Sequence, residues 1–282
     1  MQDVTRRLLL SHLAAPAMTA LVYPMRIEPL WLELTRTPVR FFPEPLSEPL
    51  RLLHLADLHA SWVVPPAFID EALDLAISTK PDLVCVTGDF VTGSTGFDPD
   101  RLRSQLERLS RVAPTFGVLG NHDGGHWARE SVRGGFDSSD NVLRLTNDAG
   151  LQMLHNQACQ FEFRGKKMNL AGVGDLWADE MDGEAAFRGF NAEPPTMLLA
   201  HNPDCKDHLS RHRWDLMLSG HTHGGQVVLP GLGTRLAPVE DQRYVAGLKP
   251  WGRRQVFVTR GVGSALGVRF RCRPEVSLLL VS

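Results

Sequence analysis

The sequence predicts an α/β domain, because short apolar runs alternate with segments of helical periodicity and most of the runs end in polar residues. The runs, rich in Leu, Val and Met, occupy residues 50–55, 83–87, 116–119, 168–173, 197–200, 216–218, 256–258 and 276–281. Predominantly apolar runs of this kind are typical of strands buried on both faces of a sheet. Between several of them, residues 66–78, 102–109 and 140–149 space their apolar side chains as helices do. We therefore expect helices packed against a largely buried sheet.

The later half of the chain carries fewer helix signals and more strands separated by Gly and Pro. This change predicts a second sheet packed against the first. No internal repeat is present, and no linker divides the main body of the chain, residues 50–282, into two domains.

Length and composition exclude several classes of protein. The 282 residues are 43% hydrophobic and 22% charged, which argues against a disordered chain and against a polytopic membrane protein. Thirty Lys and Arg residues nearly balance 32 Asp and Glu residues, so there is no basic excess of the kind that nucleic-acid partners require. The four cysteines form no CxxC pair and are too few for a disulfide scaffold.

The amino terminus, residues 1–25, predicts contact with a membrane. Leu8 to Met25 contains no charged residue and follows Arg6-Arg7, and its 18 residues just reach the length of a membrane span. The segment also resembles a twin-arginine export signal. We expect a membrane anchor or a signal of this type, and hence a protein associated with the inner membrane on a side that the sequence leaves open. An anchor lying on the membrane surface and a short helix packed on the protein's own core both remain open.

Residues 26–49 predict a strand followed by a linker into the main body. Leu30, Leu32 and Leu34 alternate with other side chains, and Val39-Arg40-Phe41 continues the strand-like pattern. Pro43, Pro45 and Pro49 then indicate the linker.

Five polar clusters follow apolar runs, and ligands of α/β folds bind where strands end. The clusters are Asp57-Leu58-His59, Gly88-Asp89, Gly120-Asn121-His122-Asp123, Ala200-His201-Asn202 and Gly220-His221-Thr222-His223. We expect their side chains to meet at one rim. Carboxylate, amide and imidazole donors without thiolate suit Mn, Fe or Zn. Seven candidate ligands exceed the three or four that one catalytic metal needs, so the clusters predict two divalent metal ions.

The ordered motifs DLH, GDF, GNHD, AHNPD and GHTHGGQ closely resemble those of the calcineurin-like metallophosphoesterase superfamily, from about Leu50 to the carboxyl terminus. The resemblance implies a four-layer α/β/β/α sandwich. It also implies a first metal held by Asp57, His59 and His223, a bridging Asp89, and a second metal completed by Asn121, His201 and His221. His122 would be the acid for the leaving group, with Asp123 as its orienting partner.

Within the superfamily, the amino-terminal region and the GHTHGGQ motif resemble a bacterial membrane-associated branch. That branch includes exported phosphodiesterases and a UDP-2,3-diacylglucosamine pyrophosphatase. Gly88-Asp89 is followed by Phe90-Val91-Thr92-Gly93 and not by the Asp-Arg-Gly of protein Ser/Thr phosphatases, which argues against a protein phosphatase.

We therefore expect a metal-dependent phosphoesterase that hydrolyses a phosphodiester or pyrophosphate bond by attack of a hydroxide shared between the two metals. A lipid-linked, amphiphilic substrate is compatible with the amino terminus. Phosphomonoester hydrolysis on the same fold stays open as an alternative. A non-catalytic metal-binding scaffold is disfavoured, because no ligand has been lost. A mononuclear peptidase and a serine hydrolase are disfavoured by the absence of HExxH and GxSxG motifs.

A few further side chains follow strand-like runs without belonging to these clusters. Trp62, Trp127 and Trp177 could pack against an apolar part of a substrate, but ordinary packing is the simpler expectation. Arg260 could contact a substrate phosphate, although an exposed, solvated side chain is the default. Asp175 most simply belongs to a turn.

Overall fold

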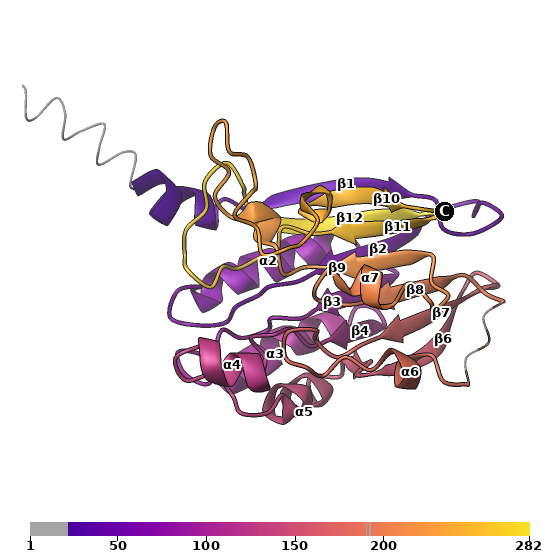
Figure 1. Ribbon diagram of the computed structural model, residues 1–282, viewed down its shortest axis with the longest axis horizontal. Helices are drawn as coiled ribbons and strands as arrows, with labels where there is room; N and C mark the ends of the chain where they lie inside the picture. The colour runs from indigo at the N-terminus through magenta and orange to yellow at the C-terminus, as the bar shows by residue number, and fades with distance from the viewer. Residues whose placement is uncertain (1–21, 190, 192) are drawn as a thin grey trace, which may run out of the picture.

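Two six-stranded sheets pack face to face in the computed structural model, which describes residues 22–189, 191 and 193–282 (Figure 1). A buried apolar cluster from the facing sides of both sheets fills the space between them, and it includes Leu52, Leu83, Leu170 and Leu199. Helices cover the outer face of each sheet over two further apolar clusters. This arrangement confirms the predicted four-layer α/β/β/α sandwich.

The first sheet has the order β1-β12-β2-β3-β4-β5. Its strands are β1 (Glu33–Val39), β12 (Glu275–Val281), β2 (Leu50–Leu55), β3 (Leu83–Thr87), β4 (Thr115–Val118) and β5 (Gln152–Met153). Strands β2 to β5 run parallel, whereas β12 is antiparallel to β2 and parallel to β1. Every residue of β3 is buried, as its uninterrupted apolar sequence predicts.

The second sheet has the order β10-β11-β9-β8-β7-β6. Its strands are β10 (Gly247–Trp251), β11 (Arg254–Val258), β9 (Leu216–Ser219), β8 (Thr196–Leu199), β7 (Lys166–Gly172) and β6 (Gln157–Phe163). The four central strands are parallel, and β10 and β6 are antiparallel edges. No apolar run predicts these two edges, because all of their residues are exposed or only partly buried.

Helices α2 (Pro66–Ser78), α3 (Pro99–Ser110) and α5 (Asp140–Asp148) fall where the periodicity predicts them. Helix α2 buries Phe68, Ile69 and Leu73 in the apolar cluster on the outer face of the first sheet. The side chain of Asp98 caps α3 by accepting hydrogen bonds from two backbone N–H groups of its first turn. Short helices complete the outer layers: α4 (His126–Ser131), α6 (Gly183–Ala186) and α7 (Cys205–His208).

Two short helical turns, η1 (Tyr23–Ile27) and η2 (Glu28–Leu30), precede β1 at the end of the molecule near α2 (Figure 1). The backbone N–H of Arg269 donates to the carbonyl of Pro24, and the buried carboxylate of Glu28 accepts from the N–H groups of Arg271 and Cys272. The turns are thus attached to the loop between β11 and β12. Most of the apolar segment Leu8–Met25 lies outside the described residues. In the part of the chain that the structure describes, no helix combines the length and apolarity needed to cross a bilayer.

Candidate metal centre

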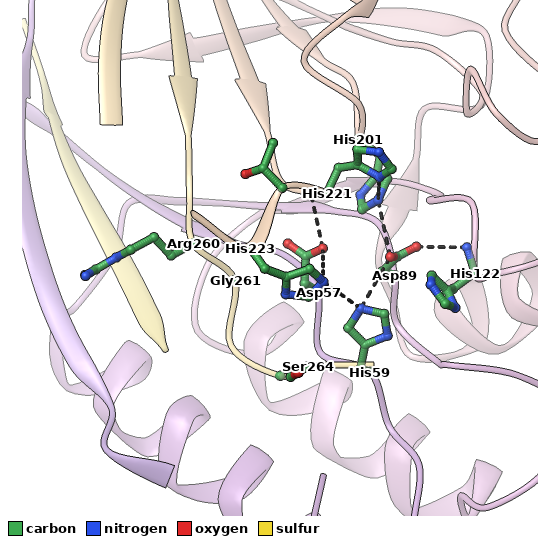
Figure 2. Close-up of polar contacts among 12 residues, drawn as sticks. Asp57, His59, Asp89, His122, His201, His221, His223, Arg260, Gly261 and Ser264 are labelled. Atoms are coloured by element: carbon green, nitrogen blue, oxygen red, sulfur yellow. Dashed lines mark hydrogen bonds and ion pairs between the residues drawn. The ribbon is translucent and has the colours of Figure 1, made fainter. Parts of the chain in front are cut away.

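Five loops, each following a parallel strand, carry the predicted site residues to one place (Figure 2). Three come from β2, β3 and β4 of the first sheet, and two come from β8 and β9 of the second. Backbone hydrogen bonds join them in pairs: Asp57 donates to the Gly88 carbonyl, and Gly220 donates to the His201 carbonyl. The rim that the sequence predicts is therefore built from both sheets.

A first group of four buried side chains could hold a cation. One ligand atom from each of Asp57, His59, Asp89 and His223 lies within 4.8 Å of all the others. His59 Nε2 is 3.1 Å from His223 Nε2 and 3.4 Å from Asp89 Oδ2, and His223 Nε2 is 3.5 Å from Asp57 Oδ1. Nitrogen and oxygen donor atoms that crowd together in this way are typical of a metal site.

A second group adjoins the first through Asp89. The Oδ2 atom of Asp89 is 3.3 Å from His201 Nε2, which is 3.3 Å from His221 Nδ1. His221 Nδ1 is in turn 2.9 Å from Asn121 Oδ1. The structure therefore brings all seven candidate ligands together, with one carboxylate between two sets of donors (Figure 2).

Neighbouring oxygen atoms fix two of the imidazole rings. His201 Nδ1 lies 2.8 Å from the carbonyl oxygen of Thr87, and His59 Nδ1 lies 3.1 Å from the hydroxyl of Thr92. In the neutral ring, an Nδ1–H that donates to oxygen leaves Nε2 as the atom with a free lone pair, and both Nε2 atoms face Asp89.

The loops reach this geometry with unusual backbone conformations. Five of the candidate ligands have φ between 49° and 68°, a left-handed backbone region that residues other than Gly rarely adopt. They are Asp57, His59, Asp89, His221 and His223. Such conformations concentrate at functional sites, where the surrounding structure must hold them. Gly261, at φ 71°, packs against Asp57 so closely that a Cβ there would lie 2.6 Å from the Asp57 Cβ.

The charges of the site favour a bound cation. Burial lowers the pKa of His59 and of His221 to about 3, so both imidazoles are neutral and can act as ligands. Burial, together with the charge of Asp89, raises the pKa of Asp57 to about 7. For His201, burial opposes protonation, but Asp89 and Asp57 outweigh it and raise the pKa well above the usual value. The carboxylates of Asp57 and Asp89 thus favour positive charge in the space between them.

Several buried polar atoms of the site also lack a hydrogen-bond partner in the described part of the chain. They are Asp57 Oδ2, His221 Nε2 and His223 Nδ1. Unpaired buried polar atoms are rare in folded proteins and require an explanation. The unpaired Asp57 Oδ2, the neutral imidazoles of His59 and His221, and the oxygen and nitrogen donor set fit a metal centre.

Comparison with known proteins supports the same conclusion. The family model of calcineurin-like phosphoesterases matches residues 50–225. The chain is 40% identical over 278 residues to the phosphodiesterase YaeI of Escherichia coli (strain K12), and the match covers 98% of each chain. It is 29% identical over 316 residues to the UDP-2,3-diacylglucosamine pyrophosphatase LpxG of Chlamydia trachomatis, with 95% of this chain and 94% of that enzyme covered.

The chain belongs to the calcineurin-like phosphoesterase family. It is a hydrolase of phosphoesters with a buried cluster of Asp and His side chains suited to metal.

In this phosphoesterase, His122 lies at the edge of the cluster. Its ring centroid is 4.8 Å from that of His59, and its backbone N–H donates to Asp89 Oδ1. The contact expected between Asp123 and the His122 ring is not made. The carboxylate of Asp123 instead accepts three backbone N–H groups, those of Asp89, Val91 and Gly120, and the His122 Nδ1 lies 3.0 Å from the carbonyl of Thr92. Asp123 therefore shapes the loops that carry Asp89 and His122, and Thr92 orients the ring.

Arg260 does not face the phosphoesterase site. Its guanidinium is 2.8 Å from Glu275 and 2.7 Å from Glu33, and Figure 2 shows it directed away from the cluster. Asp175 is a turn residue, as expected, because its Oδ1 accepts the N–H groups of Trp177 and Ala178.

Trp127 and Trp177 lie beside the site and pack on its histidines. Trp127 is 4.8 Å from His122 and Trp177 is 4.3 Å from His221, measured between ring centroids. Packing on the candidate site residues thus accounts for both indoles.

The sequence motifs did not indicate Arg269, which stabilises the loop that packs against Asp57. Its fully buried guanidinium donates to the carbonyls of Arg260, Gly261, Gly263 and Cys272. These bonds hold the loop in which Gly261 packs on Asp57 and Gly263 donates to the Asp57 carbonyl. No sequence signal could have found it, because its partners are backbone atoms of its own loop.

Proposed function

We propose that the chain is a phosphodiesterase or pyrophosphatase that works with two divalent metal ions, Mn, Fe or Zn. Asp57, His59 and His223 would hold the first ion, Asp89 would be shared, and Asn121, His201 and His221 would complete the second. The position of Asp89 carries this proposal: its Oδ2 lies 3.4 Å from His59 Nε2 and 3.3 Å from His201 Nε2, between the two groups of donors.

Divalent ions bound there would act as Lewis acids that stabilise negative charge on the phosphoryl oxygens and lower the pKa of water. The chain itself supplies the remaining groups. His122 would donate a proton to the departing oxygen, and Thr92 keeps its ring in place through the bond to Nδ1. The neutral imidazoles of His59 and His221 keep their lone pairs available at neutral pH.

A diester or pyrophosphate substrate is supported by the names of the two relatives, one a phosphodiesterase and the other a UDP-2,3-diacylglucosamine pyrophosphatase. The second name also describes an amphiphilic substrate. We therefore favour a lipid-linked phosphoester as the substrate.

We also propose that the protein is attached to the inner membrane through its amino terminus. The uncharged segment Leu8–Met25 supports this. So do the half-exposed apolar side chains at its end and just beyond it, which are Met25 on η1, Leu30 on η2 and Trp31 directly after η2. Leu10→Glu places a charge within the segment. It should release the protein from the membrane fraction, whereas Leu232→Glu, at an exposed position elsewhere, should not.

The activity is tested by removing metal from the full chain, restoring Mn²⁺, and comparing bis-p-nitrophenyl phosphate with p-nitrophenyl phosphate. We expect faster hydrolysis of the diester, abolished by chelator. Faster hydrolysis of the monoester would indicate a phosphatase instead. A protein that binds no metal would overturn the proposed two-metal mechanism.

A further inference from the structure

A groove of about 610 Å³ opens beside the proposed metal centre. It is lined by Ser61, Trp62, Val63, Thr92, Gly93, Thr95, Val132, Arg133 and Gly134. Its size is within the range of small-molecule sites. The lining combines apolar side chains, hydroxyl groups and one cation, and none of the nine residues carries a carboxylate.

Thr92 joins the groove to the candidate catalytic residues. The same residue that lines the groove contacts His59 through its hydroxyl and His122 through its carbonyl, at 3.1 Å and 3.0 Å. Ser61, on the same wall, is two residues beyond His59. The groove and the candidate catalytic residues thus adjoin each other at Thr92.

Trp62 gives the groove a solvent-exposed apolar surface. Its side chain is 86% exposed, and that of the neighbouring Val63 is 43% exposed. Neighbouring exposed apolar side chains in a groove are a feature of ligand-binding sites. The indole packs on Gly96: a Cβ there would lie 2.2 Å from Trp62 Cδ1, so the absence of a side chain at Gly96 makes room for the ring.

Arg133 gives the groove a positive charge. Among the described residues, no carboxylate pairs with its guanidinium, and it makes no hydrogen bond, whereas Arg129 four positions earlier lies 3.8 Å from Glu130. An unpaired guanidinium in a groove without carboxylates complements an anionic group of a ligand.

The apolar surface continues from the groove towards the amino-terminal turns. Val63 also lines a smaller cavity of about 80 Å³, together with Met25, Leu30 and Phe68. An apolar chain in the groove therefore has an apolar path past Val63 to η1 and η2, the part of the molecule that we propose to be near the membrane.

We infer that this groove binds the apolar chain of an amphiphilic phosphoester, with a second anionic group of the same substrate at Arg133. The inference rests on the proposed function and names its substrate class. Trp62, Val63 and Val132 would contact the chain, and the phosphoryl group to be cleaved would lie at the metal centre beyond Thr92.

Binding of non-hydrolysable probes tests the inference without relying on activity. Calorimetric titration of the full-length, Mn²⁺-loaded protein would compare octylphosphonate with methylphosphonate below the micellar concentration. We expect octylphosphonate to bind about tenfold more tightly. Trp62→Ala should remove most of that difference without weakening methylphosphonate, whereas Trp31→Ala, a half-exposed Trp outside the groove, should leave it unchanged.

The charge is tested with octyl methylenediphosphonate, which adds a second anionic group. Arg133→Gln should weaken this probe about fivefold and leave octylphosphonate unchanged, and Arg129→Gln should affect neither. Equal affinity for octyl and methyl probes in the unaltered protein, or no effect of Trp62→Ala, would overturn the inference. Tight octyl binding that depends on Trp62, in a protein that hydrolyses neither a phosphodiester nor a pyrophosphate, would overturn the proposed function but support the groove.

Discussion

The Nδ1 atom of His122 lies 3.0 Å from the carbonyl oxygen of Thr92, while the hydroxyl of the same Thr92 lies 3.1 Å from Nδ1 of His59. One residue thus positions the ring that we propose as the proton donor and a ring that we propose as a metal ligand. Neither contact involves the aspartate that follows His122 in the sequence. The two roles can be separated by substitution, because one contact uses the backbone and the other uses the side chain.

Changing His122→Ala should leave metal binding intact and slow hydrolysis most for substrates with poor leaving groups. A general acid contributes roughly 10²- to 10⁴-fold, and it matters most when the departing oxygen is basic. Values of kcat for p-nitrophenyl and alkyl leaving groups, measured at full metal occupancy, check this expectation. An equal loss with both kinds of substrate would argue against the acid role.

Changing Thr92→Val should weaken metal binding at His59 while the carbonyl contact to His122 is kept. Groups that orient a ligand imidazole are typically worth 10- to 100-fold in metal affinity or activity. Competition with a chelator measures the affinity, and Thr92→Ser, which keeps the hydroxyl, serves as the matched control. If the Val and Ser variants bind metal equally well, the hydroxyl does not orient His59.

Changing Asp89→Asn should weaken both metal sites together. Its carboxylate lies between His59 and His201, so the loss of one negative charge affects both groups of donors. The number of metal ions per chain after dialysis is the measurement. Two ions still tightly bound to this variant would show that Asp89 is not shared between them.

Much of the fold and of the donor cluster could be predicted from the sequence, because buried strands leave a recognisable apolar pattern. The strands that carry the cluster are largely buried on both faces, so their sequences are predominantly apolar. Strand β2, for example, begins and ends at the predicted residues. Polar residues directly after such strands must lie at the sheet rim, which places Asp57, Asp89 and His201 without any knowledge of loop structure.

What the sequence could not predict depends on loop conformation or on exposed edges. Strand β6 has an exposed side and no apolar run. The partners of Asp123 and Arg269 are backbone groups, and any residue type supplies these, so no motif marks them. The expected contact between Asp123 and the His122 ring is not made for this reason: adjacency in the sequence did not reveal that the Asp89 loop would supply two of the three hydrogen-bond donors of Asp123.

Changing Gly261→Ala should lower metal affinity by displacing Asp57. The added Cβ would lie 2.6 Å from the Asp57 Cβ, and φ is 71° at this position. Gly247→Ala is a matched control, because φ there is 77° and nothing lies within 4 Å of the added Cβ. Both variants should lose about 1 kcal/mol of stability from the backbone conformation. Only Gly261→Ala should also lose metal affinity, measured by chelator competition; equal affinities would mean that the loop can yield without moving Asp57.

His54 should make the stability of the protein depend on pH through a group outside the donor cluster. Its ring is fully buried, with Nε2 2.8 Å from the Thr87 hydroxyl, and burial lowers its pKa to about 3 from the usual 6.5. Below pH 6.5 the unfolded chain takes up a proton at His54 that the folded chain refuses. The stability is therefore fully present above about pH 6.5 and is lost as the pH falls towards 3.

Between pH 7.5 and pH 5 this loss amounts to about 2 kcal/mol for His54 alone. Other buried histidines add to it, so the informative quantity is the difference between the unaltered protein and His54→Leu. Urea unfolding of both metal-free proteins at the two pH values gives that difference. We expect the variant to start from lower stability at pH 7.5, because the Thr87 hydroxyl loses its partner, and to lose about 2 kcal/mol less on acidification. An identical loss in both proteins would mean that His54 is protonated as readily in the folded chain as in the unfolded one.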